Sequence, residues 1–72
     1  MNNKFKVQLI DMLTASAKAE KSKALLTLEL LANHPAGIGD HSTDDFYKNA
    51  EEALEALADA DDKLEAIQKY LI

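Results

Sequence analysis

The stretch DDFYKNAEEALEALADADDKLEAIQKYL, residues 44–71, decides the fold of this chain. Its apolar side chains recur at intervals that alternate between four and three residues, and they form an uninterrupted seam over almost four heptads. The seam consists of Phe46, Ala50, Ala53, Leu57, Ala60, Leu64, Ile67 and Leu71. This spacing is typical of one helix that packs along its whole length against another. We therefore predict a helix over about 43–71 whose seam faces a second helix.

The second helix is expected in the N-terminal half of the same chain. Residues from about 3 to 33 contain neither proline nor glycine, whereas the one proline and both glycines fall within residues 34–41. Proline disfavours helical backbone at the residue before it, so the first helix should end near Asn33. Ser42 and the acidic Asp45 resemble a capping box that starts the next helix. We predict a single domain over 1–72, an all-α antiparallel hairpin with helices over about 3–33 and 43–71 and a loop over 34–42.

The leucines of the first helix exceed what one partner helix can cover. Placed at about 100° per residue, they point around nearly the full circumference. A chain of 72 residues without cysteine also has a small core and no disulfides, so self-association is expected to supplement its stability. We predict a helical-bundle homo-oligomer, most simply a four-helix dimer. The expected interface residues are Leu25, Leu26, Leu28, Leu30, Leu31, Phe46, Leu57, Leu64 and Ile67.

A turn centred near Ile38 fixes the expected register of the hairpin. It places Leu57 beside Ala19 and Ala60 beside Ser16. Large side chains would then meet small ones along the whole interface, as close packing requires. The same register sets a cluster of lysines in the first helix opposite the acidic residues Glu51, Glu52, Glu55 and Asp59.

That lysine cluster is the main candidate for a ligand site. Lys18, Lys21 and Lys23 could meet the phosphates of a small nucleotide, and Tyr47 or Tyr70 could stack on its base. The competing interpretation is that the lysines form ion pairs with the second helix. A net charge of −5 and the absence of arginine weigh against binding to nucleic acid.

Other chemistry is poorly supported by the sequence. His34, Asp40 and His41 share the loop, but this set lacks the helical spacing of a metal site, and we assign no metal and no cofactor. We find no nucleophile with a base beside it and expect no enzymatic activity. The apolar stretch near the N-terminus is interrupted by Gln8 and Asp11 and is too short to cross a bilayer, so we expect a cytoplasmic protein.

Residues 31–71, LANHPAGIGDHSTDDFYKNAEEALEALADADDKLEAIQKYL, resemble small accessory reading frames of T-even-like tailed phages and cyanophages. The resemblance lies in the loop His-Pro-x-Gly-Ile-Gly-Asp-His and in the acidic helix that ends in Lys-Tyr. It implies a protein that acts in the cytoplasm of an infected bacterium, and it supplies no catalytic residues.

Two function classes stay open. The first is a protein-interaction module, an oligomeric hairpin that docks on a host or viral protein. The second is an anti-defence sponge that sequesters a cyclic nucleotide or an NAD-derived signal at subunit interfaces. Surplus apolar interface would favour the first class, and a polar cavity between subunits would favour the second.

Overall fold

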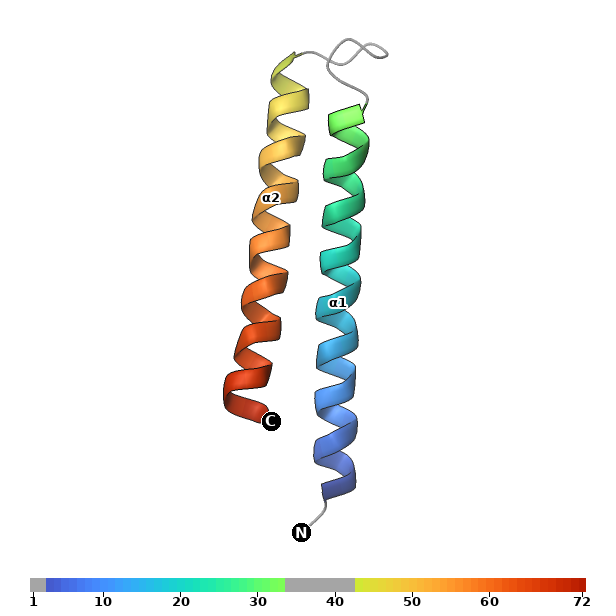
Figure 1. Cartoon of the computed structure of the whole chain (residues 1–72), viewed down its shortest axis with the longest axis vertical. Coiled ribbons are helices and arrows are strands. Elements are labelled where there is room, and N and C mark those ends of the chain that lie inside the picture. The colour runs from blue at the N-terminus through green and yellow to red at the C-terminus, as the bar shows by residue number, and fades with distance from the viewer. Residues whose placement is uncertain (1–2, 34–42) are drawn as a thin grey trace.

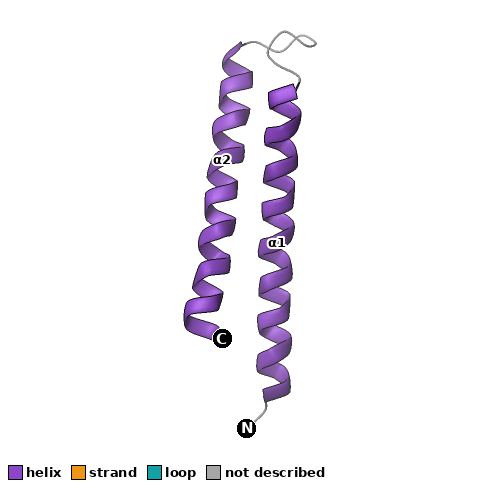
Figure 2. Ribbon diagram, in the orientation of Figure 1, coloured by secondary structure: helices purple, strands orange, loops and turns teal. Residues whose placement is uncertain are grey.

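The computed structural model describes residues 3–33 and 43–72, and these residues form an antiparallel hairpin of two long helices. Helix α1 runs from Asn3 to Asn33, helix α2 from Thr43 to Ala66, and a π-helical turn, η1, continues α2 over Ile67–Leu71. Figure 1 shows the helices side by side along most of their length, and Figure 2 shows no strand among the described residues. The hairpin is narrow, with extents of 57 × 17 × 14 Å.

The helix bounds agree closely with the sequence prediction. Asp44 and Asp45 lie in the first turn of α2 and Lys63 in its last turn, where each complements the helix dipole. The predicted second helix differs only at its end, where η1 replaces the last α-helical turn. The loop over 34–42, with His34, Asp40 and His41, and the capping residue Ser42 fall outside the described residues.

The core of the hairpin is built almost entirely from alanine. The buried residues are Ala17, Ala24, Ala53, Ala60 and Ile67, with exposed fractions between 0 and 7%. Larger members of the predicted seam, including Phe46, Leu57 and Leu64, are only half-buried, as is Ala50. Leu71, the last member, is 38% exposed. Alanine at the closest contacts allows the two helix backbones to approach each other closely.

The register differs from the one expected. Lys21 pairs with Asp61, and Glu20 pairs with Lys63. A turn symmetric about Ile38 would instead have set Lys21 level with Glu55, six positions earlier in α2 than Asp61. The helices are therefore shifted along each other, and the shift matches alanine with alanine. Ala24 of α1 lines the same groove as Ala53 and Ala56 of α2, so the expected match of large with small side chains is wrong here.

The shift leaves one end of each helix without an opposite helix. If Lys21 is level with Asp61, residue 11 is level with residue 71, so the first turns of α1 extend beyond the last residues of the chain. Figure 1 shows this extension at the N-terminal end of α1 and a shorter extension of α2 at the opposite end. Phe5, Val7 and Leu9 lie in the N-terminal extension and are 66, 54 and 53% exposed.

Candidate functional site

A second apolar seam runs along the side of α1 that does not face α2. Its members follow the same alternation of four and three residues, and every one of them is exposed. The second seam consists of Phe5, Leu9, Met12, Ser16, Ala19, Lys23, Leu26 and Leu30. At about 100° per residue these positions centre roughly 120° around the helix from Ala17, which packs against α2. Helix α1 therefore has two packing faces, and the hairpin uses one.

Five of the eight side chains in the second seam are large and hydrophobic. Phe5, Leu9, Met12, Leu26 and Leu30 are between 53 and 66% exposed. Sequence reasoning identified Leu26 and Leu30 but missed the other three. The alternating spacing from residue 5 to residue 30 was the signal that could have found them.

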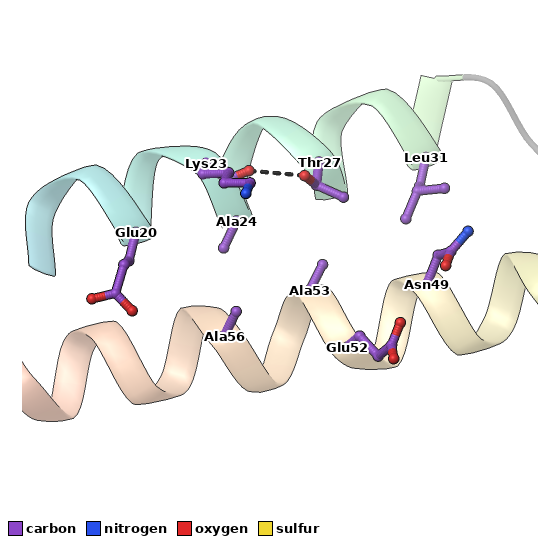
Figure 3. Close-up of a pocket in the computed structure, with 9 residues that line it drawn as sticks. All are labelled: Glu20, Lys23, Ala24, Thr27, Leu31, Asn49, Glu52, Ala53 and Ala56. Atoms are coloured by element: carbon purple, nitrogen blue, oxygen red, sulfur yellow. Dashed lines mark hydrogen bonds between the residues drawn. The ribbon is translucent and has the colours of Figure 1, made fainter. Parts of the chain in front are cut away.

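A shallow groove lies between the helices beside this seam, and it holds about 550 Å³. Figure 3 shows Ala24 of α1 opposite Ala53 and Ala56 of α2, where short side chains leave the space open. Its other lining residues are Glu20, Lys23, Thr27, Leu31, Asn49 and Glu52. The Thr27 hydroxyl donates a 2.9 Å hydrogen bond to the Lys23 carbonyl oxygen, so this donor already has a partner within its own helix.

A second groove of about 290 Å³ lies nearer to the chain ends, and it is lined in part by Leu13, Ser16, Ala17 and Ile67. Glu20 and Lys63 line this groove, and Glu20 also lines the larger one, so their ion pair lies between the two. Because Ser16 and Lys23 belong to the second seam and each lines a groove, the seam and both grooves occupy one face of the hairpin.

Two ion pairs flank the alanine core. Lys21 Nζ lies 2.9 Å from an Asp61 carboxylate oxygen, and Lys63 Nζ lies 3.0 and 3.2 Å from the two carboxylate oxygens of Glu20. All four side chains are between 41 and 55% exposed. Exposed pairs of this kind contribute about 0.2–1 kcal/mol each, so they specify register more than they add stability.

The predicted ligand residues do not converge on one site within the chain. Lys21 and Lys23 are about 160° apart around α1, with Lys21 paired to Asp61 and Lys23 at the groove. Lys18 is exposed and forms no ion pair with any residue of 3–33 or 43–72. Tyr47 and Tyr70 lie near opposite ends of the second helical segment, roughly 34 Å apart at 1.5 Å per residue.

The predicted interface residues divide into two groups. Leu28, Leu31, Phe46, Leu57 and Leu64 are half-buried and Ile67 is buried, in the seam between the helices. Leu25, Leu26 and Leu30 remain 46, 57 and 53% exposed. The expectation that one partner helix cannot cover the leucine cluster is therefore confirmed.

No group of three potential metal ligands occurs in the described part of the chain. Neither described helix has the length and apolar character needed to cross a membrane. Comparison with protein-family models, with curated proteins and with solved structures found no match for this chain.

Proposed function

We propose that this chain is a non-enzymatic protein-interaction module whose hairpins associate into a homo-oligomer, most simply a four-helix dimer. The observation that supports the proposal is the distribution of apolar side chains. Among the residues that the structure describes, four of the five buried ones are alanine, whereas twelve large hydrophobic side chains are exposed. A monomer stabilised by its own core would show the opposite distribution.

The exposed area of the chain supports association as well. The chain exposes 5745 Å². A compact monomer of 7.9 kDa is expected to expose about 4,400 Å². The surplus of roughly 1,300 Å² exceeds the ~800 Å² that each partner of a standard protein interface buries. One further hairpin packed on this one would bring the exposed area per chain near the usual range.

The outer surface of the proposed oligomer would be acidic. Residues 43–72 hold nine acidic side chains against three lysines, and the seam of α2 that faces α1 contains none of the acids. We propose that this acidic surface docks on a host or viral protein with a basic surface, since complementary charge speeds association and excludes wrong partners.

The alternative function, a sponge for a nucleotide signal, draws less support from the geometry. The larger groove presents one lysine, Lys23, together with the carboxylates of Glu20 and Glu52, and these would repel phosphate. A sponge would have to assemble its cations from several chains. A sponge needs these lysines to bind phosphate, whereas the interaction module does not. An experiment on the lysines can therefore separate the two functions.

The proposal is tested by light scattering coupled to size exclusion, over a hundredfold range of protein concentration. We expect a dimer or a larger closed oligomer, and a folded monomer at every concentration would refute the proposal. Thermal shift against cyclic dinucleotides and NAD-derived nucleotides tests the alternative. Stabilisation by a nucleotide that Lys23→Ala abolishes would favour the sponge, whereas no shift across the panel would favour the interaction module.

A further inference from the structure

We infer that the second seam of α1 is a self-docking surface, on which a second copy of the chain packs its own α1 in the antiparallel direction. The inference deepens the proposed homo-oligomer, on which it rests, by assigning the interface and its symmetry. Helix α1 would lie in the middle of the assembly, and the acidic α2 of each copy would lie outside.

The seam carries large apolar residues toward both ends, on either side of a midpoint between residues 17 and 18. Large apolar residues occupy both ends, with Phe5, Leu9 and Met12 on one side and Leu26 and Leu30 on the other. Two copies related by a twofold axis at the midpoint would pair Phe5 with Leu30 and Leu9 with Leu26. Each apolar end of one copy then covers an apolar end of the other, as a twofold interface requires.

Small residues occupy the middle of the same seam. Ser16 of one copy would meet Ala19 of the other, so the helix backbones could approach closely at the twofold axis. The contact would extend over the 26 positions from residue 5 to residue 30, roughly 38 Å at 1.5 Å per residue. It includes the N-terminal extension of α1, which has no partner within its own chain.

Charge also favours the antiparallel direction. A parallel arrangement would bring Lys23 of one copy against Lys23 of the other. In the antiparallel pair the methylene stem of Lys23 covers Met12 of the second copy and its ammonium group reaches solvent.

The chain has no cysteine, so single cysteines introduced for spin labels give unambiguous distances between copies. Gln8→Cys and Ala15→Cys place labels at exposed positions that flank the seam. Antiparallel pairing sets residue 8 of the two copies roughly 28 Å apart along the helix axis and residue 15 roughly 8 Å apart. We expect a long distance for the first label and a short one for the second, measured by pulsed and continuous-wave electron paramagnetic resonance.

Two neighbouring leucines provide a matched pair of variants. Leu26 lies in the seam, and Leu25 is exposed about 160° from the centre of the seam. Leu26→Lys would place two charges against apolar residues, and we expect it to raise the dissociation constant of the dimer by at least about 100-fold. Leu25→Lys should change it less than about threefold. Circular dichroism verifies that both variants stay helical.

The outcomes separate this inference from the proposed function. Short distances for both labels would show a parallel pair, and equal weakening by both leucine variants, or weakening by Leu25→Lys alone, would show another interface. Each of these results overturns the inference and leaves the homo-oligomer standing. A monomeric wild-type chain overturns both.

Discussion

The alanine core gives a sharp prediction for Ala60→Leu. Ala60 is fully buried at 0% exposure, and Ala17 is 1% exposed on the facing helix. Leucine adds three carbon atoms at a position where no space remains, so the helices must separate or the side chain must leave its preferred rotamer. Overpacking of this kind costs about 1–3 kcal/mol. The total stability of a 72-residue chain is expected to be roughly 4–11 kcal/mol, so the loss is a large fraction of it.

The measurement is the thermal unfolding midpoint by circular dichroism, at one fixed chain concentration because association shifts the midpoint. We expect a decrease of roughly 4–24 °C, at 4–8 °C per kcal/mol for a domain of this size. Ala58→Leu is the matched control, since Ala58 is exposed on the same helix and its replacement should leave stability within about 0.5 kcal/mol. If Ala60→Leu melts at or above the wild-type midpoint, the two helices do not pack through Ala60.

Two further predictions follow from the contacts between the helices, and a third follows from the sequence of the loop. Leu57→Asp places an unpaired carboxylate in the half-buried seam and should unfold or dissociate the protein. Circular dichroism and light scattering measure the two effects. A thermal unfolding midpoint equal to that of the wild type would contradict the packing. A double-mutant cycle on Lys21 and Asp61 should give a coupling free energy of about 0.2–1 kcal/mol that decreases as the salt concentration rises. A cycle on Lys21 and Glu55 should give no coupling. Coupling to Glu55 and none to Asp61 would show that the symmetric register is correct. Gly37→Val should cost roughly 1–3 kcal/mol in chemical denaturation if the loop needs a positive φ there, a prediction that rests on the sequence alone.

The seam in residues 46–71 was sufficient to predict the hairpin. Residues that alternate at intervals of four and three lie on one side of an α-helix. A repeat of this length therefore predicts both the helix and the face by which it packs. The single proline and the two glycines marked the break between helices in the same way, through the backbone angles that they favour or disfavour.

The register could not be obtained from the same reasoning. A heptad seam packs comparably well after a shift along its partner, because the pattern repeats. Which shift prevails depends on the summed fit of side chains such as Ala24 with Ala53 and on flanking pairs such as Lys21 with Asp61. Each of these terms is small, so a symmetric turn about Ile38 was a reasonable assumption that the contacts overturn.

The candidate site shows a related gap between pattern and structure. The leucine cluster predicted an exposed apolar surface, but it lies at one end of α1 only. Phe5, Leu9 and Met12 complete the surface at the other end, and they become informative only once the shifted register leaves that end without a partner. The register of the hairpin therefore determines which face of α1 is available.

The alanine core and the apolar exterior have one physical explanation. Alanine favours helix formation and allows a close approach of backbones, but its burial removes little apolar area, so it aligns two helices without stabilising them strongly. The large side chains that would supply that stability lie on the outer side of α1. If a second copy covers them, folding and association become one equilibrium, and the hairpin is populated only where the chain is concentrated enough to pair. A dimeric interaction module of this kind would present two copies of its acidic surface. A partner with two matching sites would then bind far more tightly than through either contact alone, because the rigid dimer holds both contacts together.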